Sequence, residues 1–247
     1  MKRNNVFSIF LILSLIGLVN PLKGQSNSPE QDILIDVAHG QKFWKDIFLP
    51  ENSNLQREKY LASEIEKTIT PFNGQIGFIN TKINKEILSD CKVLFIHVPT
   101  MKYSKNEILS ITQFIRNGGS LFLVMEEDYW TTLEQTNVND IISPFEMQFG
   151  GLISDSTTGG HTKEGKLTKQ SIKIPYQGGR IVKGGIPFCF SNASDDIFFG
   201  TYKKIENGGK IVIMGDGMVS LYMNSWEDVK DYQCREFMTD VFDWLMH

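Results

Sequence analysis

Side chains that could do acid–base chemistry follow a short apolar run near the start of the chain. Residues 33–41 read Ile-Leu-Ile-Asp-Val-Ala-His-Gly-Gln, so Asp36 and His39 lie at the end of a predicted buried strand. A histidine titrates near neutral pH and a neighbouring carboxylate can orient its ring, so the pair suits general acid–base catalysis. Asp36 could instead cap a neighbouring backbone group or only hold His39, and the spacing leaves both interpretations open.

Polar residues also follow three later apolar runs. They are Thr100, the run from Glu126 to Asp128, and Asp216. In open α/β sheets ligands bind at the carboxyl ends of the strands, so we expect these side chains to share one edge of a sheet. The predicted catalytic set is His39, Asp36, Asp128 and Asp216. Carboxylate oxygens also suit a divalent cation, but no metal-binding motif is present and we predict no metal site.

The same edge is predicted to carry residues that bind a ligand. Aromatic side chains near it could stack on sugar rings, although they could equally belong to the core or to a lid. The predicted ligand-binding residues are Gln41, Trp44, Thr100, Tyr129, Trp130 and Gly217.

Several common chemistries lack their motifs. The chain has no Gly-x-Ser-x-Gly or Gly-x-Cys-x-Gly elbow, no phosphate-binding Walker loop, and no Gly-x-Gly-x-x-Gly after the first predicted strand. We therefore predict no nucleotide or other cofactor. The net charge is −4 and no dense basic patch stands out, so nucleic acid is not a predicted partner.

The elements that must position these residues alternate along the chain. Apolar runs at 33–38, 75–79, 92–98, 121–125 and 210–214 predict strands. Amphipathic segments between them predict helices, one of which begins with the capping box Ser104-x-x-Glu107 and ends at Gly118-Gly119. Further predicted helices cover 133–142 and a last segment capped by Ser225. This alternation predicts an α/β fold with a mainly parallel sheet and helices on both faces. Residues around 145–205 lack it and predict an irregular β-rich insertion.

The first residues have a different character. Lys2 and Arg3 precede an apolar run at residues 6–19, which is typical of a secretory signal peptide. We predict a signal peptide at 1–24 and one domain at 25–247, located in the bacterial periplasm or outside the cell, without membrane contact after cleavage; an uncleaved anchor is the alternative. The three cysteines, Cys91, Cys189 and Cys234, are expected to be buried thiols, with one disulfide as the alternative.

Four stretches carry a resemblance to a known superfamily. They are residues 33–40, residues 93–99, the unit from Ser104 to Val124 with its Gly-Gly pair, and residues 209–216. In that order they resemble class I glutamine-amidotransferase-like domains, and most of all a bacterial branch related to gliding-motility auxiliary proteins and intraflagellar-transport amino-terminal domains. Trehalose-utilisation-type proteins are more distantly similar.

The resemblance implies a flavodoxin-like three-layer sandwich. This sequence departs from true amidotransferases, because no cysteine lies in the strand-to-helix turn that presents the amidotransferase nucleophile. We therefore expect an exported accessory or ligand-binding protein, in polysaccharide utilisation or an envelope complex, whose partner is a small molecule, a glycan or a protein. The alternative is a carbohydrate hydrolase or lyase that uses His39 with Asp36, Asp128 or Asp216.

Overall fold

The computed structural model describes residues 32–41, 55–155, 159–221 and 231–247. The predicted signal peptide, the ligand-binding candidate Trp44 and the predicted cap Ser225 lie outside these ranges. Within them, no helix is long and apolar enough to cross a membrane.

The described elements alternate as the sequence predicts, with a helix between each pair of consecutive strands from the first to the fourth. The α-helices are α1 (Leu55–Ile69), α2 (Lys85–Leu88), α3 (Lys105–Arg116), α4 (Val138–Ile142), α5 (Met218–Leu221) and α6 (Cys234–Met246), and two 3-10 turns span Thr70–Phe72 and Ser143–Phe145. The strands are β1 (Ile33–Asp36), β2 (Ile76–Ile79), β3 (Val93–His97), β4 (Ser120–Val124), β5 (Gln148–Ile153), β6 (Gly160–Thr162), β7 (Lys173–Ile174), β8 (Gly179–Lys183), β9 (Ile186–Ser191), β10 (Phe198–Lys204) and β11 (Lys210–Met214).

A mixed sheet forms the centre of the molecule. Its order is β2-β1-β3-β4-β11-β10-β9-β6-β7, and the first five strands are parallel. These five follow the flavodoxin-like order, in which the chain moves from β1 to one side and then returns to the other. The point of reversal lies between β1 and β3, so the carboxyl end of β1 opens at the position where such sheets bind ligands.

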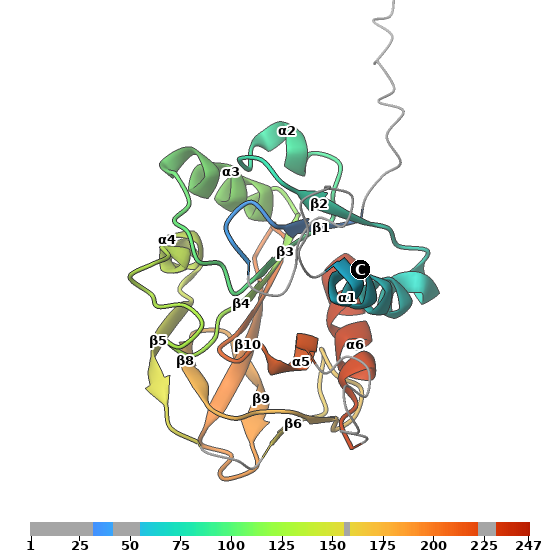
Figure 1. The fold of residues 1–247 in the computed structure, drawn as a ribbon, viewed down its shortest axis with the longest axis vertical. Coiled ribbons are helices and arrows are strands. Elements are labelled where there is room, and N and C mark those ends of the chain that lie inside the picture. The colour runs from blue at the N-terminus through green and yellow to red at the C-terminus, as the bar shows by residue number, and fades with distance from the viewer. Residues whose placement is uncertain (1–31, 42–54, 156–158, 222–230) are drawn as a thin grey trace, which may run out of the picture.

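Helices cover both faces of this sheet (Figure 1). Alternate residues of a strand point to opposite faces, and β1 shows this directly. Ile33 and Ile35 pack in one hydrophobic cluster with α1 and α6, whereas Leu34 packs in a second cluster with α3 and α4. The predicted α/β architecture with a large, mainly parallel sheet is therefore confirmed.

The predicted β-rich insertion is also present. Strands β5 to β10 all lie between residues 148 and 204. Four of them extend the sheet by antiparallel pairing, and β5 and β8 form a separate two-stranded ribbon.

Local signals located helix α3 correctly. The Ser104 hydroxyl accepts a hydrogen bond from the Glu107 N–H, and the Glu107 carboxylate accepts one from the Ser104 N–H, so the predicted capping box is formed. The helix is followed by Gly118, whose φ of 105° is a left-handed conformation that favours glycine.

Three predicted boundaries are wrong. Strand β1 ends at Asp36 rather than at residue 38, because the Asp36 carboxylate accepts a hydrogen bond from the Ala38 N–H and starts a turn. The helix predicted for 133–142 is only α4, because reciprocal bonds between Thr132 and Gln135 close a separate turn before it. Helix α6 begins at Cys234, since the preceding Gln233 pairs with β7 through the backbone of Lys173. The part of the predicted helix that precedes residue 231 lies outside the described residues.

The three cysteines form no disulfide in the structure. Cys91, Cys189 and Cys234 are all free cysteines, and the last two are buried. The stability of the fold therefore depends on its packed cores and not on a disulfide.

Candidate functional site

The turn after β1 is held by the end of β3. Gly40 has a φ of 69°, and a Cβ atom at this position would collide with the Thr100 Oγ1 atom. The Thr100 N–H donates to the His39 carbonyl at 2.9 Å, and its hydroxyl donates to the Gly40 carbonyl at 2.8 Å. A glycine is therefore required here, and the position of His39 is fixed by two bonds from the neighbouring strand exit.

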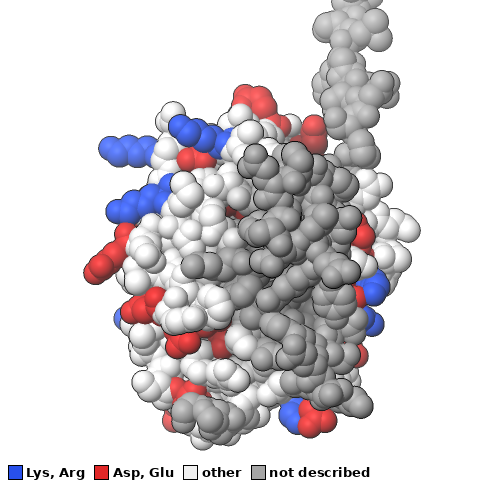
Figure 2. Space-filling model, viewed as in Figure 1, with Lys and Arg blue, Asp and Glu red and all other residues white. Residues whose placement is uncertain are grey.

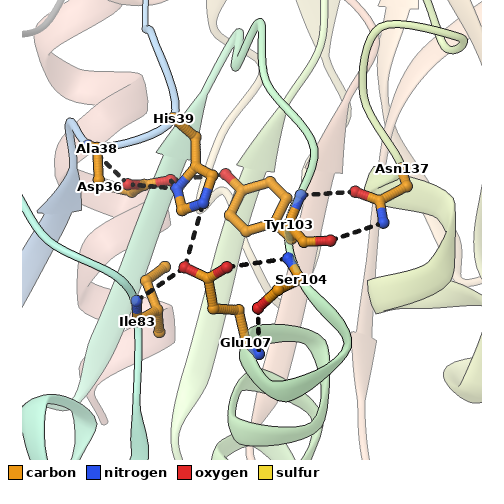
Figure 3. A network of polar contacts seen from close by, with 8 residues as sticks. All are labelled: Asp36, Ala38, His39, Ile83, Tyr103, Ser104, Glu107 and Asn137. Carbon is orange, nitrogen blue, oxygen red and sulfur yellow. Dashed lines mark hydrogen bonds and ion pairs between the residues drawn. The ribbon is translucent and has the colours of Figure 1, made fainter.

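His39 lies between two buried carboxylates (Figure 3). Its Nδ1 atom is 2.9 Å from Asp36 Oδ2, and its Nε2 atom is 3.2 Å from Glu107 Oε1. The exposed fraction is 5% for His39, 0% for Asp36 and 3% for Glu107. We call these three residues, together with Tyr103, the His39 clamp, because they join the end of β1 to the first turn of α3.

Tyr103 completes the clamp from above the imidazole. Its ring stacks on the His39 ring with centroids 3.9 Å apart, and its hydroxyl donates to Asp36 Oδ2 at 2.6 Å. Asn137 fixes the tyrosine backbone, since its side chain accepts from the Tyr103 N–H at 2.8 Å and donates to the Tyr103 carbonyl at 3.0 Å. The loop before α3 is thus held on both sides.

The two carboxylate oxygens of Glu107 make separate contacts. Oε2 accepts from the Ser104 N–H at 2.9 Å within the capping box, and Oε1 accepts from the Ile83 N–H at 3.0 Å while it faces His39. Burial alone would raise the pKa of Glu107, but these backbone bonds and the nearby His39 hold it below its ordinary value. The carboxylate is therefore ionised at neutral pH.

The charge on His39 follows from its two partners. Burial alone would lower the pKa of His39, but the hydrogen bond and charge of Asp36 and the charge of Glu107 outweigh it and raise the pKa above 6.5. When His39 is protonated, both ring nitrogens donate, Nδ1 toward Asp36 and Nε2 toward Glu107. In that form the imidazolium has no lone pair left to accept a proton from a substrate.

The exit of β3, next to the clamp, carries a strained residue. Val98 has a φ of 46°, which is a rare conformation for a β-branched residue, and its side chain is fully buried. In α/β-hydrolases a sharp, strained turn after a strand presents the nucleophile. Here the turn presents an apolar side chain to the core.

A second buried polar group lies at the ends of β4 and β11. Glu126 Oε2 accepts from the Gly217 N–H at 2.7 Å, and Asp216 Oδ1 accepts from the Met218 N–H at 2.7 Å. The exposed fractions of Glu126 and Asp216 are 3% and 1%. These bonds fix the turn between β11 and α5 and account for the aspartate at its centre.

Burial dominates the electrostatics of this second group. It raises the pKa of Glu126 to about 7, and it raises the pKa of Asp216 strongly, with the charge of Glu126 adding to the effect. His97, the last residue of β3, is also fully buried, and burial lowers its pKa to about 3. This histidine is therefore neutral at physiological pH, and its Nε2 atom lies 3.4 Å from the Gly217 carbonyl.

The structure brings together only part of the predicted catalytic set. Asp36 and His39 are in direct contact. Asp128 instead pairs with Arg180, whose guanidinium also donates to the Thr131 carbonyl at 2.8 Å. Among the described residues, no hydrogen bond or ion pair joins His39 to Asp128 or Asp216.

The predicted ligand-binding residues have different environments. Thr100 and the Gly217 N–H are used by the hydrogen bonds given above. Gln41 is 4% exposed, and its side-chain amide has no hydrogen-bond partner among the described residues. Tyr129 is 80% exposed, and its ring meets that of Trp130 edge to face at 5.0 Å. Trp44 is outside the described ranges.

Sequence reasoning missed three important residues. Tyr103 and Glu107, which lie just before and within α3, complete the clamp. Arg180, which pairs with Asp128, comes from the β-rich insertion. For Glu107 a signal existed, because a capping box leaves one carboxylate oxygen free to bind elsewhere. No local pattern marks Tyr103 or Arg180.

Comparisons with known proteins bear on the family and the fold. The family model of the IFT52 GIFT domain matches residues 56–156, which is less than half of the chain. No curated protein matches the sequence significantly.

Three solved structures are similar to this chain in fold. The mmIFT52 N-terminal domain has a TM-score of 0.64 at 14% identity, covering 87% of this chain and 97% of that one. A ThuA-like protein from Bacteroides uniformis ATCC 8492 has a TM-score of 0.53 at 12% identity, covering 89% and 93%. A beta-galactosidase from Bacillus circulans sp. alkalophilus has a TM-score of 0.55 at 10% identity, covering 87% of this chain but only 30% of the enzyme.

These matches confirm part of the predicted resemblance. The chain shares its fold with the intraflagellar-transport domain and with a ThuA-like protein, as expected for the intraflagellar and trehalose-utilisation branches. The similarity to the galactosidase is a similarity of fold to less than a third of that enzyme. The architecture is thus a mixed α/β fold similar to the folds of the mmIFT52 N-terminal domain and of the ThuA-like protein.

Proposed function

We propose that this chain is a non-catalytic accessory domain that binds a partner protein at the carboxyl edge of its sheet. One observation carries the proposal. Both nitrogens of His39, the histidine at the topological reversal between β1 and β3, are held by buried carboxylates. A general base needs a free nitrogen within reach of its substrate, and the clamp uses both nitrogens for structure. The valine at the exit of β3 supports the same conclusion.

Exposed side chains that follow β3 and β4 support a protein partner. Met101 and Tyr129 follow β3 and β4 and are 54% and 80% exposed. Aromatic residues and methionine are enriched in protein–protein interfaces. Met101 also lies close to the Gly40 turn, since a Cβ atom at Gly40 would be 3.5 Å from its Cγ atom. The two side chains are therefore available to contact a partner, and each lies on a loop whose position is fixed by the strand before it.

Other features of the proposal come from the sequence. We assign the fold to the three-layer, class I glutamine-amidotransferase-like architecture, on the strength of the strand order and the helices on both faces. The basic start and apolar run of residues 1–24 support export to the periplasm or the exterior. On the face in Figure 2, basic side chains of the described part lie at the upper left, acidic ones lie below them, and both kinds occur at the right. This face has no large basic patch among its described residues, which does not favour nucleic acid.

A glycan or small-molecule ligand would use the same edge, with Tyr129 as the exposed ring. No described contact favours the alternative of a carbohydrate hydrolase or lyase, because His39 lacks a free nitrogen and Asp128 and Asp216 have other partners.

Cross-linking in the native cells tests the proposal. A tagged full-length chain would be compared with the double variant Met101→Glu/Tyr129→Glu after chemical cross-linking and mass spectrometry. The matched control is Leu109→Glu/Leu152→Glu, which alters two side chains that are 53% and 47% exposed on α3 and β5. We expect one reproducible partner for the wild type and the control, and its loss in the Met101/Tyr129 variant.

Two results would overturn the proposal. One is an unchanged set of cross-linked proteins in the Met101/Tyr129 variant. The other is turnover of an oligosaccharide substrate by the purified chain that disappears in a folded His39→Gln variant.

A further inference from the structure

A cavity of about 790 Å³ lies at the opposite edge of the sheet from the His39 clamp. It is bounded by the beginnings of β3, β4 and β11, by the turns at Gly118-Gly119 and Gly208-Gly209, and by the last turn of α6. Pockets for small ligands commonly measure roughly 300–1,000 Å³. The proposed function makes no use of this edge.

The charge of this cavity contrasts with that of the chain. The whole protein carries a net charge of −4. Among the described residues that line the cavity, however, no aspartate or glutamate side chain occurs. The lysines are Lys85, Lys92, Lys204 and Lys210, and they are joined by His247, whose Nδ1 atom lies 3.0 Å from Asp243 Oδ1. Of these lysines, only Lys92 forms an ion pair with a described residue, at 2.6 Å from Asp32.

Two of these lysines are direct neighbours on adjacent strands of the sheet. Lys204 on β10 is the direct register partner of Lys210 on β11 in an antiparallel pair. Like charges directly opposite each other destabilise such a pair. The pKa of Lys210 is lowered, first by burial and then by the charge of Lys204, while Asp243 acts in the opposite direction. The two lysines therefore lie opposite each other at a cavity wall, where their like charges are unfavourable, and the Lys210 ammonium also lies 5.5 Å from the centre of the Trp244 ring.

We propose that this cavity binds an anion that bears phosphoryl groups. The lysine ammonium is a compact point charge that binds phosphate oxygens. A phosphoryl group carries about two negative charges on one compact centre, which matches two facing lysines better than a singly charged carboxylate does. A bound dianion would neutralise the Lys204–Lys210 pair and remove its repulsion. This inference goes beyond the proposed function and does not depend on it.

A different account of the lysines makes a different prediction. The carboxyl ends of α3 and α6 reach this edge, and cations stabilise helix carboxyl ends. If the lysines served only that purpose, replacing them would lower stability and the cavity would bind no anion.

Calorimetric titration of the full chain with pyrophosphate tests the proposal. The variant Lys204→Gln/Lys210→Gln removes the facing pair. The matched control is Lys102→Gln/Lys105→Gln, which removes two exposed lysines at the other end of α3. We expect pyrophosphate to bind the wild type and the control, more weakly at high ionic strength, and about tenfold more weakly to the Lys204/Lys210 variant. That variant should melt at or above the wild-type temperature, because the repulsion is gone.

Each further outcome is decisive. Binding of pyrophosphate without binding of vesicles that contain phosphatidylglycerol would support the proposal with a free phosphorylated compound as ligand. Binding of both would support it with a lipid headgroup. Absence of pyrophosphate binding, equal weakening in both double variants, or equally tight binding of citrate would overturn it.

Discussion

The Nε2 atom of His39 lies 3.2 Å from Oε1 of Glu107, so the turn after the first strand is bound to the residue that caps helix α3. The same imidazole is bound at Nδ1 by Asp36. A pair of residues that looks like catalytic machinery in the sequence is thus part of a buried ionic contact between two elements of the fold.

Replacement of His39 by glutamine is expected to destabilise the protein. A single amide cannot bridge both carboxylates, so one buried charge is left unpaired, and breaking a buried ion pair typically costs about 3 kcal/mol or more. Chemical denaturation at pH 6 measures the loss. The control is His161→Gln, because the side chain of His161 is 28% exposed and its contacts are at the surface, which should cost less than about 1 kcal/mol.

The size of this loss should depend on pH. Because the pKa of His39 is raised above 6.5 in the folded state, its stabilisation is fully present below that value and is lost as pH rises through the folded pKa. The difference between wild type and His39→Gln should therefore be larger at pH 6 than at pH 9. An equal or smaller difference at pH 6 would mean that the imidazolium is not the stabilising form.

Tyr103→Phe isolates one hydrogen bond of the clamp. The ring can still stack on His39, but the 2.6 Å bond to the buried Asp36 is lost, and such a loss typically costs about 1–3 kcal/mol. Tyr176→Phe is the matched control, since its buried hydroxyl has no hydrogen-bond partner among the described residues. We expect Tyr176→Phe to be neutral or stabilising in thermal melts. Equal effects of the two changes would argue against the clamp.

Val98 offers a test of backbone strain. Both Val98→Ala and Val98→Gly remove buried methyl groups, but only glycine relaxes at a φ of 46°. The left-handed conformation costs an L-residue roughly 1–2 kcal/mol, so the glycine variant should be the more stable of the two despite its smaller side chain. Urea denaturation of both variants gives the answer, and a more stable alanine variant would show that the strand exit is not strained.

Glu126→Gln is expected to change how stability depends on pH. Burial raises the pKa of Glu126 from 4.5 to about 7. The stabilisation of the fold by the neutral carboxyl is therefore complete below pH 4.5 and is lost as pH rises through about 7. Glutamine stays neutral and pays no such penalty. Between pH 5 and pH 9 the variant should gain relative to the wild type by up to about 3 kcal/mol. A parallel pH profile for the two proteins would contradict the role of burial.

The fold could be predicted further than the site. Helix α3 was located because its cap and its glycine end are local signals. The contact between Asp36 and His39 was also predictable, because the two residues are three positions apart in one turn. Their contacts with Tyr103 and Glu107 depend on how α3 packs against the sheet, which no local pattern in the sequence encodes.

The predicted convergence of Asp128 and Asp216 on His39 has a geometric obstacle. Neighbouring strands are about 4.8 Å apart, so residues after β4 and β11 start about two and three strand spacings from β1. Short aspartate side chains cannot span that distance. Asp128 pairs with Arg180 from the insertion instead, and Asp216 binds the backbone of its own turn.

The protonation state of His39 tests the central claim most directly. Nitrogen-15 chemical shifts of the imidazole, followed by NMR from pH 5 to pH 9, report whether each ring nitrogen carries a proton. The clamp predicts that both nitrogens are protonated at pH 6.5 and that the imidazole titrates above 6.5. A neutral imidazole with one unprotonated nitrogen at that pH would contradict the clamp and return His39 to the list of candidate bases.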